Sequence, residues 1–88
     1  MNWRYVKAIK TDLSYDADIT WYIRLCENPI RANAFYINDR TGMLYGYNGG
    51  NYSIDNDNYL ILFGNLVFNP KEWQITSTEE YLRVLGIL

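Results

Sequence analysis

The chain has 88 residues, a formal net charge of −2 at pH 7 and an isoelectric point near 4.9. This length supplies one hydrophobic core, and 49% hydrophobic with 20% charged residues indicates a single globular domain over residues 1–88. The scattered basic residues and acidic balance exclude the electrostatic surface that nucleic-acid binding requires. The absence of histidine and the presence of one cysteine, Cys26, exclude most imidazole- and thiolate-based catalysis and metal binding.

The N-terminal third predicts two strands separated by a turn. Residues 3–10 (WRYVKAIK) alternate imperfectly and predict a strand, whereas residues 11–18 are polar and turn-like. Residues 19–26 (ITWYIRLC) fit the periodicity of either a helix or a strand. A helix would leave Trp21 and Leu25 outside its apolar face. A strand gives a cleaner division, and the β-branched and aromatic content favours it. It places Ile19, Trp21, Ile23 and Leu25 on one face and Thr20, Tyr22, Arg24 and Cys26 on the other.

A hairpin is predicted in the centre of the chain. Asn28–Pro29 ends the preceding strand, because proline lacks the backbone donor of a strand ladder. Residues 31–38 and 43–48 then form the two strands around a turn at 39–42. Strict alternation places one set of side chains on one face of the second strand: Met43, Tyr45 and Tyr47.

The next segment predicts further short strands. The glycines of Asn48–Asn51 indicate a second tight turn with positive φ, after which residues 52–54 resume a strand. Residues 59–63 (YLILF) are apolar throughout, which predicts a strand at the sheet centre with both faces covered. Gly64–Asn65 is either a reversal or a bulge within a longer strand that ends at Phe68.

The C-terminus predicts the one helix of the chain. Asn69–Pro70 ends the last of these strands, and Thr76 or Ser77 can serve as N-cap because Glu79 and Glu80 follow each at three residues. Gly86 suits the left-handed residue that closes a helix. We expect this helix to pack over residues 59–63. The predicted fold is α+β and mostly antiparallel: a meander of about five to seven short strands with one C-terminal helix.

The closing segment also carries a family resemblance. Residues 73–85 (WQITSTEEYLRVL) resemble the closing strand and helix of the SUKH immunity-protein superfamily. Those domains are longer than this chain, and the resemblance implies a strand followed by a helix without implying a role for any residue.

Candidate chemical sites have simpler structural interpretations. Asp55–Asn58 resembles a calcium loop, but Leu60 and Leu66 occupy the positions that require glycine and glutamate. Cys26 has no histidine to activate it and is interpreted as a buried apolar residue. The glycine-rich segment 46–50 lacks the lysine of a phosphate loop. A catalytic carboxylate pair would require the fold to bring together two of Asp12, Asp16, Asp18 and Glu27, for which turn and capping roles are the simpler interpretation.

The remaining signal is an excess of aromatic residues, 17% of the chain, which a core of this size does not bury completely. Tyrosine and asparagine gather on the central hairpins and are well suited to recognition, although cross-strand tyrosine pairs also stabilise sheets. The predicted binding residues are Tyr36, Tyr45, Tyr47, Tyr52, Asn48 and Asn51, and Asn33 is a further flanking asparagine.

These residues favour a non-catalytic protein-binding module, such as a small inhibitor, immunity or phage accessory protein. Carbohydrate or small-ligand binding and a structural homo-oligomer are the alternatives. We expect a protein partner, no nucleic acid, no membrane, no cofactor, no metal and no catalytic residue. A single cysteine forms no internal disulfide, and neither a signal-peptide h-region nor a run of ~20 apolar residues is present, so a cytoplasmic location is predicted.

Overall fold

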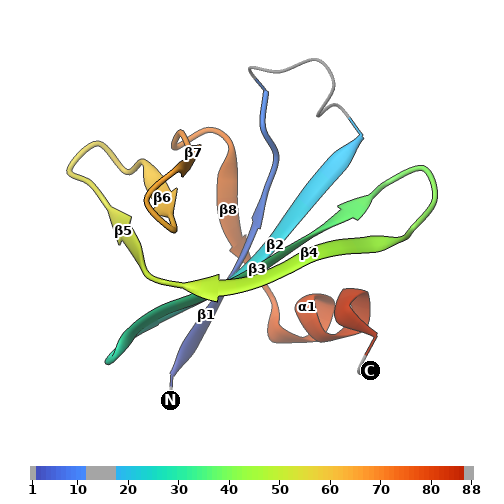
Figure 1. Ribbon diagram of the computed structural model, residues 1–88, viewed down its shortest axis with the longest axis horizontal. Helices are drawn as coiled ribbons and strands as arrows, with labels where there is room; N and C mark the ends of the chain where they lie inside the picture. Colours follow the sequence, from blue (N-terminus) through green and yellow to red (C-terminus); the bar gives the residue numbers. More distant parts are fainter. Residues whose placement is uncertain (1, 12–17, 87–88) are drawn as a thin grey trace.

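Antiparallel pairing divides the strands between two sheets (Figure 1). The structure is a computed structural model that describes residues 2–11 and 18–86. The larger sheet has the order β4-β3-β2-β1-β8, and the smaller has the order β5-β6-β7. The α+β class is confirmed. The described residues form these elements: β1 (Trp3–Ala8), β2 (Ile19–Glu27), β3 (Ile30–Asn38), β4 (Leu44–Gly50), β5 (Tyr52–Ile54), β6 (Leu60–Leu62), β7 (Leu66–Phe68), β8 (Trp73–Thr76) and α1 (Thr78–Leu85).

Strand β2 lies at the centre of the larger sheet, between β3 and β1. The strand interpretation of residues 19–26 is therefore confirmed. Its register with β3 runs without interruption from Ile19 opposite Asn38 to Glu27 opposite Ile30. Alternation explains the burial on both faces, because Ile23 packs toward one side of the sheet and Tyr22 toward the other.

The larger sheet is covered on both faces by different elements. Helix α1 and the small sheet lie on opposite sides of it (Figure 1). On one side, which we call the small-sheet face, Ile23 and Leu25 of β2 pack with Leu60, Leu62 and Phe68. On the other, the helix face, Tyr22 and Phe35 pack with Tyr81 of α1.

This arrangement corrects the expectation that the helix packs over residues 59–63. Strand β6 is central only within the three-stranded sheet, where Leu60 and Leu62 are buried, Ile61 is half-buried and Tyr59 is exposed. Only one face of that strand is therefore covered. The physical reason is that the five-stranded sheet offers the small sheet one apolar face and the helix the other.

Local turn chemistry explains how residues 62–65 reverse the chain. Phe63 and Gly64 both have positive φ, and the Asn65 amide donates to the Leu62 carbonyl at 3.1 Å. Two successive residues with positive φ make a type I′ turn, whose twist matches that of the flanking strands. Of the two possibilities left open at Gly64–Asn65, the reversal is therefore the one observed, with its central residues at Phe63 and Gly64, one position earlier than expected.

Helix α1 begins and ends as its capping signals predict. Ser77 is the N-cap, and its hydroxyl accepts a hydrogen bond from the Glu80 amide at 3.0 Å. Glu80 does not complete the reciprocal capping box, because its carboxylate accepts from the Thr76 hydroxyl and pairs with Lys7 of β1 at 3.6 Å. Gly86 adopts the left-handed conformation at the C-terminal end. These contacts fix the helix against the larger sheet.

Strand β4 continues to Gly50, so the turn predicted at Asn48–Asn51 is wrong. Neither Gly49 nor Gly50 has positive φ. Both positions need a small residue because other side chains approach them. A Cβ added at Gly50 would lie 2.7 Å from the Phe63 ring, and one added at Gly49 would lie 2.8 Å from Asn33 Nδ2. The chain then passes through Asn51 directly into β5 and the second sheet.

Candidate binding surface

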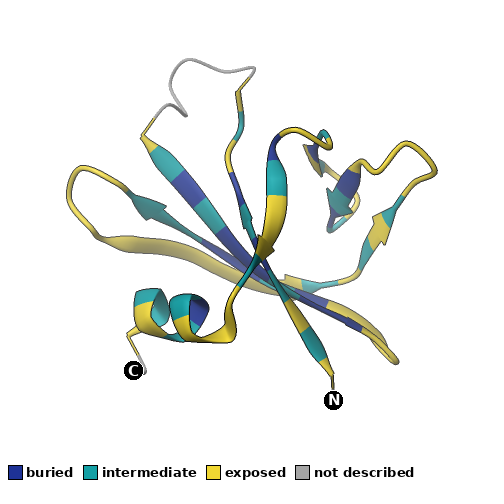
Figure 2. Cartoon of the chain, turned by 180° about the vertical axis from the view of Figure 1, so that it is seen from behind, coloured by how far each residue is buried: buried dark blue, intermediate teal, exposed yellow. Residues whose placement is uncertain are grey.

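Strand β4 is an exposed edge of the larger sheet. It pairs with β3 on one side only, and six of its seven residues are exposed, as its yellow colour in Figure 2 shows. None of the additional backbone hydrogen bonds among the described residues reaches its outer side. The strand also contains no charged residue and no proline, the residues that proteins use to prevent edge pairing. Nothing in residues 2–11 and 18–86 pairs with the outer side of β4, which leaves that side open to another strand.

A β-bulge at Gly46 divides the tyrosines of this strand between the two faces of the sheet. The register shifts between Ala34 and Tyr36, so that Gly46, with positive φ, and Tyr47 together oppose one residue of β3. As a result Tyr45 stacks on Tyr36, with ring centroids 5.5 Å apart on the small-sheet face.

On the opposite side of the same strand, Tyr47 stacks on Phe35 with ring centroids 6.0 Å apart. Phe35 belongs to the cluster beneath the helix, so Tyr47 lies on the helix face. The expectation that Tyr45 and Tyr47 share one face is therefore wrong. Tyr45 and Tyr47 are 39% and 48% exposed, respectively. The extra residue at the bulge shifts alternation by one position and reverses the direction of Tyr47.

The other predicted binding residues do not form one surface with Tyr47. The ring of Tyr36 packs on that of Trp21, with centroids 4.8 Å apart. Asn48 is opposite Ala34 on the small-sheet face. Tyr52 packs against the core from β5. The Asn51 carbonyl accepts from the Phe63 amide at 2.9 Å at the corner between the sheets. The structure therefore brings together Tyr36, Tyr45 and Asn48 and separates Tyr47, Tyr52 and Asn51 from them.

A second group of polar and aromatic residues crosses the helix face and ends at β4. Tyr5, Arg24, Asn33 and Gly49 are cross-strand partners in four adjacent strands. The Arg24 guanidinium lies 4.0 Å from the ring centroid of Trp3, and its Nε donates to Asn33 Oδ1 at 2.9 Å. Stacking and this hydrogen bond together fix the orientation of the guanidinium. We call these five residues the arginine row.

Arg24 has no carboxylate partner in the part of the chain that the structure describes. The ion pairs found there involve Arg4, Lys7, Lys10 and Arg40. A half-buried guanidinium has five N–H donors, and Asn33 accepts from only one of its nitrogens. The terminal nitrogens of Arg24 therefore remain as charged donors on the helix face.

The Tyr81 hydroxyl is a further donor on this face. It is buried and, within the described residues, has no hydrogen bond of normal geometry, although Tyr47 and Arg24 lie close enough to influence its ionisation. Burial is the largest cause of the raised pKa of Tyr81, followed by Tyr47, while Arg24 acts in the opposite direction. A buried donor without an acceptor is uncommon in native proteins and requires an explanation.

The candidate chemical sites have structural roles where they are described. Asp55 Oδ1 accepts from the amides of Asp57 and Tyr59 at 2.9 and 3.0 Å, which is the pattern of a polar turn. Cys26 is buried, with its Sγ 3.7 Å from the Asn28 carbonyl. Within residues 2–11 and 18–86, no group of three histidine, cysteine or carboxylate side chains could hold a metal ion.

The carboxylates considered above for a catalytic pair are not brought together where the structure describes them. Asp18 directly precedes β2 and Glu27 ends it, so the two residues lie about 30 Å apart at the usual rise of a strand. They pair instead with Arg40 at 3.6 Å and Arg4 at 3.5 Å. Asp12 and Asp16 lie outside the described residues.

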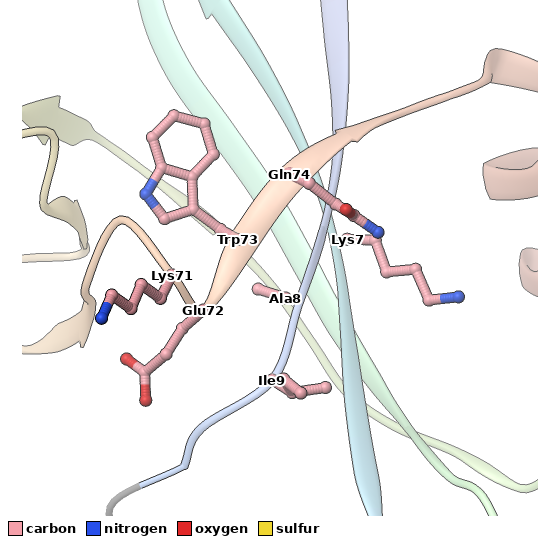
Figure 3. Close-up of a pocket in the computed structure, with 7 residues that line it drawn as sticks. All are labelled: Lys7, Ala8, Ile9, Lys71, Glu72, Trp73 and Gln74. Carbon is pink, nitrogen blue, oxygen red and sulfur yellow. The ribbon is translucent and has the colours of Figure 1, made fainter.

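A small pocket lies at the other edge of the larger sheet, and its one carboxylate, Glu72, already has hydrogen-bond partners. Residues 7–9, at the end of β1, and 71–74, around the start of β8, line a pocket of about 190 Å³ (Figure 3). The Glu72 carboxylate accepts from the Thr11 amide and hydroxyl at 2.7 and 2.8 Å and from the Asn69 amide at 2.8 Å. Glu72 therefore holds the turn before β8 and does not await a ligand.

The chain matches no protein-family model, and neither the curated proteins nor the solved structures contain a significant match to it. Helix α1 has eight residues. The described residues contain no helix that is long and apolar enough to cross a membrane. The case for function therefore depends on the surfaces described above.

Sequence reasoning named Asn33 only as a flanking residue and missed five others: Trp3, Tyr5, Arg24, Gly49 and Tyr81. One signal was present, because alternation in residues 19–26 places Arg24 on the same face as Tyr22 and Cys26. An arginine on a face that is otherwise apolar or aromatic indicates either a buried pair or a ligand.

Proposed function

We propose that this protein is a non-catalytic protein-binding module that accepts an extended strand of a partner protein on the outer side of β4. The observation that carries the proposal is an exposed, uncharged edge strand with no pairing partner on its outer side among the described residues. Strand addition uses main-chain hydrogen bonds for affinity and alternate side chains for specificity. Tyr45 and Tyr47 then flank the added strand on the two faces of the sheet.

A strand from another protein suits this edge better than a second copy of the chain. Strands β3 and β4 contain no aspartate or glutamate, so pairing β4 with itself would bring two arginine rows together without an acceptor for their donors. A foreign strand that carries an acidic residue provides the missing acceptor. A bacterial inhibitor or immunity-type protein in the cytoplasm is the setting we propose, since Cys26 is free and buried.

The test begins with affinity purification and then locates the contact by hydrogen exchange. The tagged chain captures its partner from lysate of the source organism, and the purified complex is compared with the free protein. Strand addition predicts slower exchange for the amides of β4, with little change in β8, the opposite edge. Protection confined to another surface would contradict the proposal. Protection of β4 in the isolated protein at high concentration, with a doubled mass, would replace it with a homodimer.

Matched variants separate binding from folding. Replacing Tyr45 and Tyr47 together by alanine removes the two exposed aromatic contacts of β4, and we expect a loss of affinity of at least tenfold. The control is Ile75→Ala, which changes an apolar residue on β8 that is more exposed than either tyrosine. Its affinity should be unchanged. Equal affinity for the double variant and the wild type would exclude these tyrosines from the contact.

A further inference from the structure

We propose that the arginine row is a carboxylate-binding site that selects a partner strand with an aspartate or glutamate opposite Gly49. This inference rests on the proposed function, since strand addition at β4 brings the acidic side chain to the site. It goes beyond that function by giving the chemistry of the partner. The ligand group is a side-chain carboxylate of a protein.

The chemistry follows from donors for which the described residues offer no acceptor of normal hydrogen-bond geometry. Asn33 Oδ1 accepts from Arg24 Nε, which fixes the orientation of the amide and directs its Nδ2 donors toward β4. The terminal nitrogens of Arg24 and the buried hydroxyl of Tyr81 are further donors on the same face. What this set lacks is an acceptor, and a carboxylate accepts from several donors at once.

Gly49 leaves the path to these donors open. Asn33 and Gly49 are cross-strand partners, so the residue of an added strand opposite Gly49 directs its side chain to the helix face. No side chain stands between them, because Asn33 Nδ2 lies 2.8 Å from the place that a Cβ at residue 49 would occupy. Neighbouring strands are about 4.8 Å apart, so the incoming carboxylate has one strand spacing to cross before it reaches that amide.

The local charge favours an anion in a chain that is acidic overall. Arg31 is opposite Cys26 and shares the helix face with Arg24, and it is exposed. Two arginines beside an uncharged edge give a confined positive patch. Nucleic acid requires a larger set of phosphate contacts than this patch and a net charge of −2 provide. An acidic peptide strand is therefore the better fit.

The test compares two synthetic strands that differ in one group. Acetylated Thr-Val-Thr-Glu-Thr-Val-Thr amide and its Gln counterpart are titrated into ¹⁵N-labelled protein at neutral pH. The readouts are the Arg24 Nε–H, the Asn33 side-chain amide and the β4 backbone amides. We expect the Glu peptide to shift all three sets and to bind on the order of tenfold more tightly than the Gln peptide, because bonds to charged groups are the stronger ones.

Variants assign the effect to the row. Arg24→Gln should abolish the preference for Glu over Gln, and Gly49→Ala should reduce it by displacing the Asn33 amide. Gly49 has an ordinary φ, so its alanine variant keeps the backbone and remains informative if Arg24→Gln unfolds. Arg40→Gln, which changes an arginine in the 39–42 turn paired with Asp18, is the matched control and should leave the preference intact.

The outcomes distinguish this inference from the proposed function. If both peptides shift β4 equally and leave Arg24 unmoved, the carboxylate site is overturned while strand addition stands. If the Glu peptide shifts Arg24 and Asn33 without β4, carboxylate binding stands and strand addition is overturned. Tighter binding of an eight-residue thymidine oligonucleotide at the same residues would overturn the peptide assignment in favour of nucleic acid.

Discussion

Tyr81 is the residue at which stability and binding make opposing demands. Its ring is buried against Phe35, with centroids 5.3 Å apart, but its hydroxyl forms no hydrogen bond of normal geometry among the described residues, although the Tyr47 side chain lies within its reach. A buried polar group without a partner costs about 1–3 kcal/mol. Tyr81→Phe should therefore raise the free energy of unfolding by about 1 kcal/mol in urea titrations, while weakening binding of the Glu peptide.

Tyr22→Phe is the matched control for that prediction. Tyr22 stacks on the same Phe35 ring at 5.7 Å, but its hydroxyl interacts with Lys7. Its removal should not raise stability. A loss of stability in Tyr81→Phe would mean that the hydroxyl has an acceptor in solution, and it would remove one donor from the proposed carboxylate site.

Alkaline pH gives a second prediction for the same residue. Burial raises the pKa of Tyr81 above its ordinary value near 10, so the folded state retains the proton when an unfolded tyrosine has released it. The contribution of protonated Tyr81 to the free energy of unfolding is fully present below pH 10. It declines as pH rises from 10 toward the pKa of the folded state. Urea unfolding between pH 8 and pH 11 should show the advantage of Tyr81→Phe over the wild type widening above pH 10. A constant difference would contradict this.

At the scale of elements, local signals predicted more than long-range ones. The Ser77 cap, the Gly86 termination and the alternation of β2 depend on a few neighbouring residues, and all three are confirmed. The bulge at Gly46 depends on pairing with β3, which no period-two pattern reveals. Gly49 and Gly50 resemble a turn in sequence, but the close approach of Asn33 and Phe63 is what requires their small size.

The candidate site shows the same division. Alternation alone places Arg24 on one face of its strand, but its neighbours follow from the register of three strand pairs. Trp3 is 21 residues away from Arg24 in sequence, and Tyr81 approaches only because α1 packs on that face. Side-chain pattern therefore predicts which faces exist, whereas the recognition chemistry depends on which strands become neighbours.

The turn before β8 provides a prediction at the element scale. Burial alone would raise the pKa of Glu72, but hydrogen bonds from Asn69 and Thr11 and the charge of Lys10 outweigh it, so the pKa is lowered. The stabilisation is therefore present above the ordinary value near 4.5 and is lost as pH falls through the folded-state pKa. Glu72→Gln should cost about 1–3 kcal/mol at pH 7, because the amide nitrogen cannot accept from these donors.

Chemical denaturation at several pH values checks this prediction. The difference in unfolding free energy between the wild type and Glu72→Gln should shrink from pH 6 to pH 2. The reason is that protonation makes the Glu72 carboxyl neutral, as the glutamine amide already is. Glu79→Gln, an exposed change in the first turn of α1, serves as the control for loss of one negative charge. An unchanged difference at low pH would show that the charge of Glu72 contributes nothing to stability.

At the scale of the whole molecule, the five-stranded sheet joins two separate apolar clusters. Ile23 of β2 belongs to the cluster beneath the small sheet, and Tyr22, its neighbour in the chain, belongs to the cluster beneath the helix. The same strands contribute side chains to both clusters. Loss of one cluster therefore exposes apolar surface on the larger sheet, and the remaining cluster depends on that sheet. The two sheets and the helix should therefore unfold as one cooperative unit.

Two core variants, one on each face, test this cooperativity. Leu62→Ala opens the small-sheet cluster and should cost about 2–5 kcal/mol, while Phe35→Ala opens the helix cluster and should cost about 3–5 kcal/mol. In each variant, urea transitions followed by far-UV circular dichroism and by tryptophan fluorescence should still coincide. Separate transitions in Leu62→Ala would show that residues 52–68 unfold on their own. The larger sheet would then support β4 and the arginine row without the small sheet, and binding of the Glu peptide would persist after that first transition.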